Sequence, residues 1–394
     1  MTTFGVWLGD REFALSMRKD GEVVPVCTDA AHQTYPFLVS FSKSGITFAN
    51  RAHNSIKKNY ETTVTGLRQL IGRIDNDVYV TDLKERIYYE ITAISELPFI
   101  PVSANNQLYN YSAESILAIL FYQVKYMLEK RSKEKVMDLT ITVPHYYTRR
   151  QMINVKRCAE VVGIKKVSVQ YEAEMFACYL YSFYHEEMNF GYFSLSNDEF
   201  VISEISIKEE IENGKKVPRI KTIQTASKLP KNKPRELLFY DLVEFLSDEG
   251  KDIKGDHGKE VMLRSIIDET VLNLRNSKEV EFDLSQFCPG LKKSYKESDL
   301  EDLLDVLIDE IIDFISNTSF GSFDYMVFMG ELPNFPFLIE HIKENFEGKL
   351  RVIDIPNMQP SCALGAALFG SGSFTIVPTL HHNIVIPGKK AHSV

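Results

Sequence analysis

The sequence lacks several features that would point to a membrane, a secreted or a metal-binding protein. It has no run of about 18 apolar residues, so we expect no membrane-spanning helix. The N-terminus, MTTFGVWLGDREF, lacks the basic-then-apolar pattern of a signal peptide. The few cysteines are scattered and form no CxxC pair, which favours reduced, mostly buried thiols over a disulfide framework. The sequence therefore predicts a cytoplasmic protein. The cysteines are Cys27, Cys158, Cys178, Cys288 and Cys362.

The chain also has fewer basic than acidic residues. The chain has 45 lysines and arginines against 54 acidic residues, a net charge of −9, so we expect no direct nucleic-acid binding. One basic segment, KLPKNKPR from Lys228 to Arg235, is interpreted as a solvated loop. The histidines show no metal-ligand spacing, and no G-x-S-x-G elbow is present, so neither a metal site nor a serine hydrolase is predicted.

The patterns that are present predict an α/β protein with two similar halves. Alternating apolar residues predict a strand–turn–strand hairpin at 4–17 and another at 190–207. Residues 136–185 are typical of a strand–helix–strand–helix unit, with a helix beginning after Thr148 and ending before Gly163. Ser112 is expected to cap a long amphipathic helix. Each half ends in strand–loop–helix, which indicates a duplicated fold with a cleft between two lobes.

Five strings along the chain resemble one family. They are YPFLVSF at 35–41, LIGR at 70–73, TITVPHYYTRRQ at 140–151, AEVVGIKKVSVQYEAEMFA at 159–177 and ALGAAL at 363–368. Together they resemble the nucleotide-binding domain of DnaK-type heat-shock chaperones, in the actin and sugar-kinase superfamily. The resemblance implies an actin-like ATPase fold whose two lobes each contain a duplicated mixed β-sheet and helices. It places lobe I at 1–186 with an insertion at about 36–111, lobe II at 187–359 with an insertion at about 226–304, a closing helix at 360–380 and a flexible tail at 381–394.

The resemblance also implies a remnant of the family's nucleotide cleft. The residues that fall on its motifs are Gly9, Asp10, Arg68, Glu172, Asn197 and Gly330. Gly9 persists from the first phosphate hairpin, Asp10 stands where a threonine would be, and Arg68 replaces the catalytic lysine. Glu172 matches the family's glutamate, while Asn197 lies in the second hairpin. Gly330 begins the adenosine-holding motif, which continues here as Glu331-Leu332. The family's adenine-clamping pair falls on Val271 and Leu272.

The motifs have lost most of their phosphate chemistry. Trp7 and Ser194 stand at the two aspartate positions that would organise hydrated Mg²⁺. Ser196-Asn197-Asp198 places side chains where glycine would let backbone N–H groups approach phosphate oxygens. We therefore predict no catalytic residue, no metal site and no ATP hydrolysis. Trp7 is expected to fill the vacated metal position, and Arg68 to pair with Glu172.

These losses predict a non-hydrolysing scaffold of the chaperone family, similar to the atypical subunit of the ribosome-associated complex. Its expected partner is a J-domain protein or another co-chaperone, with any ribosome contact made through that partner. Only 24 residues follow the last lobe helix, too few for a peptide-binding sandwich. The tail segment FTIVPTLHHNIVIPG would pair with a partner by strand addition or fold along its own lobe.

Two alternatives stay open. A divergent enzyme would use ATP or ADP with Mg²⁺ through altered contacts from Asp10, Arg68, Glu172 and Asp198. A regulator would instead compete with true family members for exchange factors or J-proteins.

Overall fold

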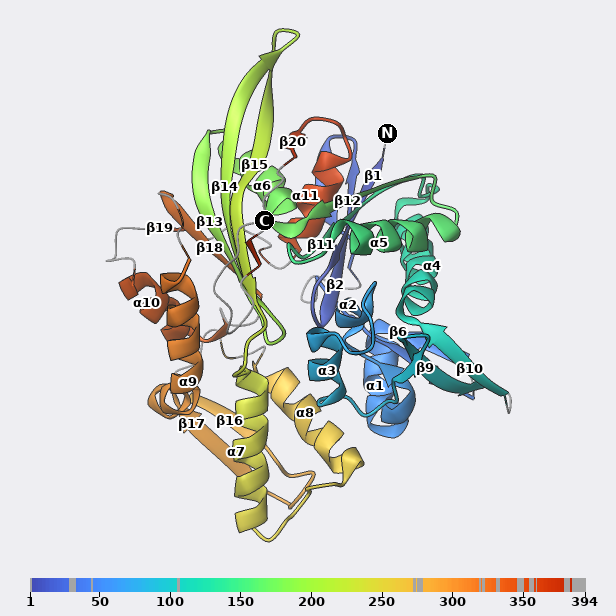
Figure 1. Cartoon of the computed structure of the whole chain (residues 1–394), viewed down its shortest axis with the longest axis vertical. Coiled ribbons are helices and arrows are strands. Elements are labelled where there is room, and N and C mark those ends of the chain that lie inside the picture. Colours follow the sequence, from blue (N-terminus) through green and yellow to red (C-terminus); the bar gives the residue numbers. More distant parts are fainter. Residues whose placement is uncertain are drawn as a thin grey trace. The chain divides into compact units, whose positions relative to one another are not determined.

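The computed structural model describes most of the chain, and the chain divides into two compact units (Figure 1). Unit 1 comprises Met1–Asn189, Ile205–Ile223 and Asp354–His381, and unit 2 comprises Phe190–Glu204, Gln224–Ile353 and His382–Val394. The described residues are 2–27, 33–43, 45–104, 107–271, 274, 279–318, 320, 323–330, 334–345, 351–353, 358, 360–378 and 383–384.

A six-stranded mixed sheet forms the centre of unit 1. The predicted hairpin is present as β1 and β2, which pair antiparallel, while β1 pairs in parallel with β11 on its other side. The order is β12-β11-β1-β2-β3, with β4 paired to β2. The bounds are β1 Thr3–Leu8, β2 Glu12–Lys19, β3 Glu22–Pro25, β4 Tyr35–Pro36, β11 Asp138–Val143 and β12 Lys166–Tyr171.

Four helices of unit 1 contact this sheet, and two of them begin at side-chain caps. They are α4 Ala113–Ser132, α5 Arg149–Val161, α6 Glu172–Tyr184 and α11 Ser361–Phe369. Ser112 caps α4 and Thr148 caps α5 within a capping box, as predicted. The small-residue helix α11 packs so closely on α6 that a Cβ at Gly365 would lie 1.7 Å from the carbonyl oxygen of Met175.

The remainder of unit 1 is a segment of short helices and two small sheets. One sheet has the order β6-β5-β7 and the other the order β10-β9-β8. The bounds are β5 Val39–Ser42, β6 Gly45–Phe48, α1 Ala49–Asn59, η1 Tyr60–Thr62, β7 Thr63–Val64, α2 Leu67–Leu70, α3 Val78–Lys84, β8 Thr92–Ile94, β9 Leu97–Ala104 and β10 Gln107–Ser112.

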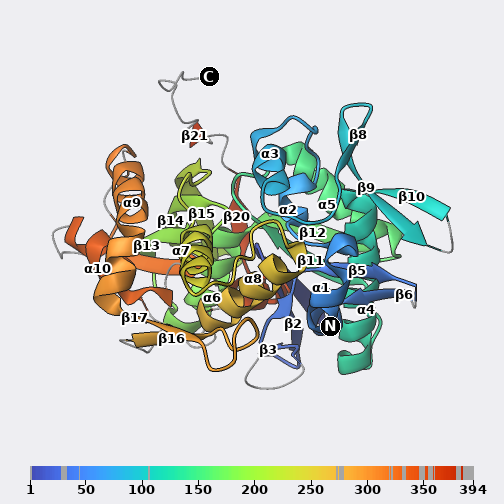
Figure 2. The same cartoon turned by 90° about the horizontal axis from the view of Figure 1, so that it is seen from below.

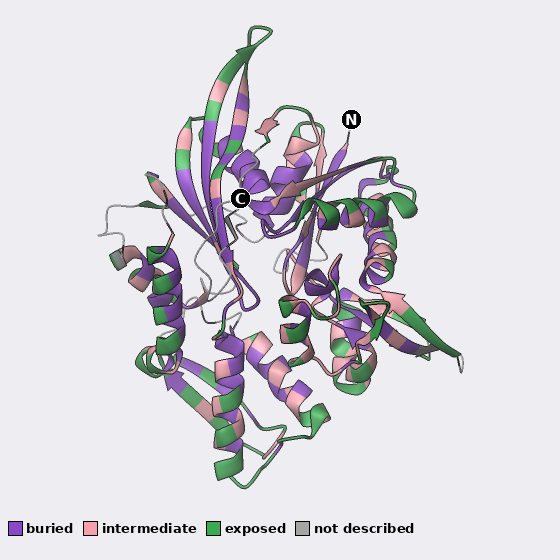
Figure 3. Ribbon diagram, in the orientation of Figure 1, coloured by how far each residue is buried: buried purple, intermediate pink, exposed green. Residues whose placement is uncertain are grey.

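Unit 2 combines sheet strands with four helices around one apolar core. The seven-stranded sheet has the order β19-β18-β13-β14-β15-β20, with β21 paired to β15, and parts of β14 and β15 together with β20 belong to unit 1. Helices α7 and α8 lie side by side (Figure 1 and Figure 2). Their inward faces join the core, which appears purple in Figure 3. The bounds are β13 Met188–Leu195, β14 Phe200–Glu212, β15 Lys215–Lys228, α7 Pro234–Asp248, α8 His257–Val271, β16 Glu279–Asp283, β17 Lys292–Lys296, α9 Glu297–Ser316, β18 Tyr325–Gly330, α10 Pro336–Asn345, β19 Arg351–Val352, β20 Thr375–Val377 and β21 Asn383–Ile384.

The C-terminal segment forms the two short strands foreseen from its sequence. Both β20 and β21 pair in parallel with β15 of the same chain, which is the arrangement of a tail folded along its own lobe. Residues 381–382 and 385–394 of the predicted flexible tail lie outside the described residues.

The interpretation of Lys228–Arg235 as a solvated loop is wrong. Lys233 and Arg235 are buried, and the Lys228 ammonium lies 2.8 Å from the buried carboxylate of Glu310. The same carboxylate accepts hydrogen bonds from the backbone N–H groups of Lys231 and Asn232. The Glu310 carboxylate of α9 therefore holds residues 228–235 in place within unit 2. Glu310 is distant in the sequence, so only the three-dimensional fold brings its carboxylate to this segment.

Candidate functional site at the end of strand β1

The candidate site of unit 1 lies where three neighbouring strands end. In the sheet register Trp7 of β1 is opposite Thr142 of β11, and Val143 of β11 is opposite Tyr171 of β12. Because these strands are parallel, their carboxyl ends share one edge of the sheet. Glu172, the first residue of α6, follows β12 directly. This register brings the Trp7 indole to Glu172, and its Nε1–H donates to Oε1 over 3.1 Å.

A buried ion cluster surrounds this hydrogen bond. Arg68 of α2 places Nη1 3.0 Å from the carbonyl oxygen of Leu8, 3.2 Å from Oδ1 of Asp10 and 3.4 Å from Oε1 of Glu172. The predicted pairing of Arg68 with Glu172 is confirmed, and Asp10 joins it. We call Trp7, Asp10, Arg68 and Glu172 the β1-end cluster. It combines one positive and two potential negative charges with little access to water.

Burial decides the protonation behaviour of the β1-end cluster. Removal from water raises the pKa of Glu172 to about 7, although Arg68 and the Trp7 hydrogen bond act in the opposite direction. For Arg68, burial disfavours the charged guanidinium, but Asp10, Glu172 and nearby tyrosines outweigh it and raise the pKa well above its ordinary value. Arg68 thus stays charged, whereas Glu172 titrates close to neutral pH.

Gly9 has a packing role in this turn. A Cβ at Gly9 would lie 2.6 Å from two carbons of the Trp7 indole, closer than real Cβ atoms come. The Gly9 N–H donates to the carbonyl oxygen of Glu12 over 2.8 Å and so closes the β1–β2 hairpin. The absence of a side chain at Gly9 therefore makes room for the indole ring.

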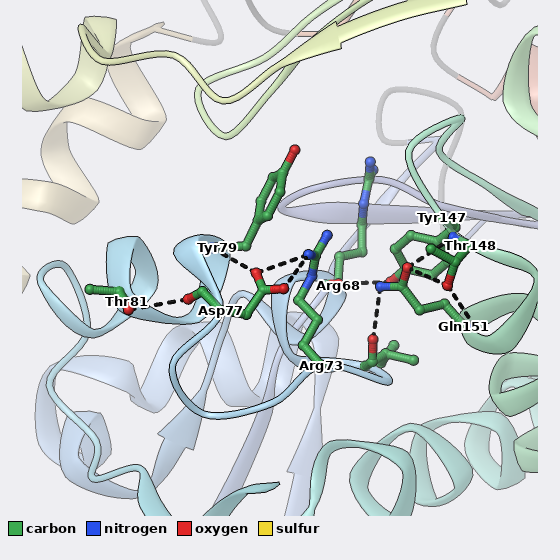
Figure 4. Close-up of polar contacts among 9 residues, drawn as sticks. Arg68, Arg73, Asp77, Tyr79, Thr81, Tyr147, Thr148 and Gln151 are labelled. Atoms are coloured by element: carbon green, nitrogen blue, oxygen red, sulfur yellow. Dashed lines mark hydrogen bonds and ion pairs between the residues drawn. The ribbon is translucent and has the colours of Figure 1, made fainter. Parts of the chain in front are cut away.

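Aromatic residues outside the predicted site contact Arg68 and hold it in place. Tyr147 donates its hydroxyl to the carbonyl oxygen of Arg68 over 2.8 Å (Figure 4). The Tyr146 ring lies 5.7 Å from the Arg68 guanidinium and stacks on Tyr79 with 5.4 Å between centroids. Arg73 covers the Tyr79 ring at 3.9 Å. The only trace of this arrangement in the sequence is the adjacent tyrosine pair after Pro144.

The remaining predicted site residues, Asn197 and Gly330, belong to unit 2. The turn between β13 and β14 is closed by its own groups, since the Ser196 hydroxyl accepts from the N–H of Glu199 over 3.0 Å. Asn197 is fully buried, and its Oδ1 accepts from the N–H of Arg235 over 3.3 Å. Gly330 pairs with Leu195, where a Cβ would lie 2.3 Å from the Leu195 carbonyl oxygen. Glu331, Leu332 and Leu272 lie outside the described residues, so the motifs that include them stay predictions.

Comparison with known proteins identifies the family. The model of the family described as Hsp70 protein matches residues 3–214, just over half of the chain. The chain belongs to the Hsp70 family. Its mixed α/β sheets and helices agree with the predicted actin-like ATPase fold of Hsp70-family domains.

Similarity to individual Hsp70-family members is weak and partial. The chain is 23% identical over 189 residues to heat shock 70 kDa protein 4 of Rattus norvegicus and 22% identical to the proteins of that name from Homo sapiens and Canis lupus familiaris. Each match spans 48% of this chain and 22% of the relative. The chain thus matches about a fifth of the length of these relatives.

Hsp70-family nucleotide-binding domains typically bind ATP or ADP with Mg²⁺. The residues of the β1-end cluster do not fit a Mg²⁺-bound nucleotide. Mg²⁺ requires near-octahedral oxygen ligands. Here Oε1 of Glu172 accepts an N–H from Trp7 and faces Arg68, which also pairs with Asp10. Within the described residues, no group of three His, Cys, Asp or Glu side chains is placed to hold a metal ion. No helix in the described part of the chain is long and apolar enough to cross a membrane.

Proposed function

We propose that this Hsp70-family protein is a non-hydrolysing scaffold or co-chaperone whose former phosphate site is a structural ion cluster. The observation that carries the proposal is the Trp7 indole hydrogen-bonded to Glu172 at 3.1 Å, beside the Arg68 guanidinium. Phosphoryl transfer depends on positioned metal ions and on charge stabilisation. In the β1-end cluster an uncharged indole occupies the place of a metal-organising carboxylate.

Electrostatics support the same proposal. Nη1 of Arg68 already contacts two carboxylates and a carbonyl oxygen. A polyphosphate would have to displace these partners and approach Asp10 and Glu172, which repel it when ionised. Because Arg68 is buried, separating it from these partners would cost several kcal/mol, in the range of about 3–5 kcal/mol for breaking a buried pair. We infer that nucleotide is not needed to hold this part of the fold together.

The partner in this proposal follows from family membership. A scaffold of this kind would bind a J-domain protein or another co-chaperone in the cytoplasm, assist another chaperone during protein folding or stress, and reach the ribosome through its partner. Affinity purification of the tagged chain from its native cells tests this. A stable J-domain protein in one-to-one ratio supports the scaffold, whereas transient capture of several co-chaperones supports a competing regulator.

A second candidate function is ATP or ADP binding with altered contacts. The observation in its favour is that a permanently charged guanidinium remains at the end of β1, where Arg68 has Nη1 within 3.4 Å of Glu172. Arginine recognises phosphate through a planar array of N–H donors. In this alternative, nucleotide binding would pull Arg68 away from Asp10 and Glu172.

Trp7 supplies a direct test because it is the only tryptophan of the chain. Nucleotide-stripped protein is titrated with ATP and with ADP, each with Mg²⁺, while Trp7 fluorescence and heat are recorded. The scaffold proposal expects no heat, no fluorescence change and no thermal shift. A ligand at 100 times its dissociation constant would stabilise the fold by about 2.7 kcal/mol. Binding that disappears in Arg68→Met, or turnover that disappears in Glu172→Gln, would establish the second candidate instead.

A further inference from the structure

Helix α5 of unit 1 presents a basic, partly apolar stripe to solvent. The stripe consists of Arg149, Arg150, Ile153, Lys156, Arg157 and Val161, all exposed. Ile153 is 40% exposed and Val161 is 78% exposed. Lys156 lies 3.7 Å from Glu160, but within the described part of the chain the three arginines make no ion pair. We call these six residues the α5 stripe.

The positive charges of the α5 stripe do not stabilise helix α5. Arg149 and Arg150 occupy the first two positions of the helix, where the positive end of the helix dipole disfavours cations. No acidic residue occupies the first turn. A sequence that places arginines here at a local cost in stability indicates a use outside the helix.

Helix α9 of unit 2 presents an acidic surface to solvent. Its exposed carboxylates recur every three or four residues and surround Val306, which is 50% exposed. Like charges at this spacing destabilise a helix by about 0.2–0.5 kcal/mol per pair. These carboxylates form no ion pair with any described residue. We call the set the α9 stripe, and it consists of Asp299, Asp302, Asp305, Val306, Asp309 and Asp313.

The inward faces of α5 and α9 pack within their own units, and the two stripes lie on the solvent-exposed faces of these helices. On α9, Leu304, Leu307 and Ile311 belong to the core of unit 2, and the buried Glu310 holds Lys228. On α5, Asn154 donates to the Glu114 carboxylate of α4 over 3.1 Å. Figure 3 shows exposed residues along the outer side of α5. Each stripe is therefore available to a partner without rearrangement of the core.

We propose that the α5 stripe of one copy of this chain binds the α9 stripe of a second copy. The two stripes are opposite in charge, both expose aliphatic side chains, and they are similar in length. At 1.5 Å per residue the α5 stripe extends about 18 Å and the α9 stripe about 21 Å. Contact between them would relieve the like-charge repulsion on both helices and cover Ile153 and Val306.

The proposed contact is heterologous, because each copy contributes a different surface. A pair as a whole leaves one α5 stripe and one α9 stripe unoccupied, on different copies, so further copies can add. The exposed charges are screened over about 8 Å at physiological ionic strength, which makes the association dependent on salt. This inference uses no residue of the β1-end cluster and does not rest on the proposed function.

Sedimentation of the full chain at about 0.05 M and about 0.5 M salt tests the proposal. Wild-type protein is expected to form concentration-dependent oligomers at low salt and to dissociate at high salt. Arg150→Ala/Arg157→Ala and Asp305→Asn/Asp309→Asn should each weaken self-association at least about tenfold, as expected for lost charge pairs across an interface.

Mixing the two variants distinguishes this contact from any other. The first variant keeps its α9 stripe and the second keeps its α5 stripe, so a mixture should form one-to-one dimers that grow no further. Matched controls are Arg51→Ala/Lys58→Ala on α1 and Asp248→Asn/Glu249→Gln at the end of α7, which change the same net charge at exposed positions. A wild-type chain that stays monomeric at low salt, or oligomers unaffected by both stripe variants, would overturn the proposal.

Discussion

Replacing Arg68 by methionine should destabilise the protein far more than its single positive charge suggests. Arg68 is buried, and its Nη1 lies 3.2 Å from Asp10 and 3.4 Å from Glu172. Methionine fills similar space but leaves both buried carboxylates without their cation. Removing one partner from a buried ion pair costs about 3–5 kcal/mol. For a protein of this size that corresponds to a fall in Tm of about 5 °C.

Thermal and urea unfolding of the purified full chain measure the effect. The loss should be largest at pH 8 and smaller at pH 5.5, because protonation of Glu172, whose pKa is raised to about 7, reduces the uncompensated negative charge in the Arg68→Met variant. Lys84→Met on α3 is the control from the same insertion. Lys84 pairs with Asp75 at 2.6 Å while 34% of its side chain is exposed, so its loss should cost about 1 kcal/mol or less.

A triple variant separates lost charge pairing from lost packing. Arg68→Met/Asp10→Asn/Glu172→Gln replaces all charges of the β1-end cluster by neutral groups of similar size, and neutral replacement of a buried ion group is often tolerated. It should recover most of the stability that Arg68→Met loses. An Arg68→Met variant as stable as wild type at pH 8 would refute the conclusion that this cluster holds the fold together.

The remaining predictions concern the pH response and the close packing of unit 1. The pKa of Glu172 is raised from 4.5 to about 7, so the folded state binds the extra proton and stability should fall as pH rises from about 4.5 to 7. Glu172→Gln should remove part of this slope, and Glu174→Gln should remove another part, because burial also raises the pKa of Glu174 to about 7. Trp7 fluorescence should titrate near pH 7 in wild type and in Glu174→Gln but not in Glu172→Gln; a pH-independent wild-type signal would contradict the assignment. Gly365→Ala should lower stability by about 1–3 kcal/mol through overpacking against Met175, and an unchanged Tm would show that α11 and α6 can separate.

Local patterns were sufficient to predict much of the fold. Alternation predicted the β1–β2 hairpin, and Thr148 predicted the start of α5, because capping depends only on residues within one turn. The pairing of Arg68 with Glu172 was also predictable, since the family resemblance placed both residues at one site. By contrast, nothing in the segment Lys228–Arg235 indicated burial, because the carboxylate that holds it comes from Glu310, far along the chain.

The sequence by itself determined which groups are available at the end of β1. It placed Trp7 where the family resemblance implies a metal-organising aspartate, Asp10 in the turn, and a permanent cation at Arg68. The tertiary structure alone decided what these groups do to one another. It aligned three parallel strand ends, brought the Trp7 indole to Glu172 and buried the carboxylate, so that its pKa rises to about 7. The physical reason is that a pKa depends on solvent exclusion and neighbouring charges, which exist only once distant segments have packed.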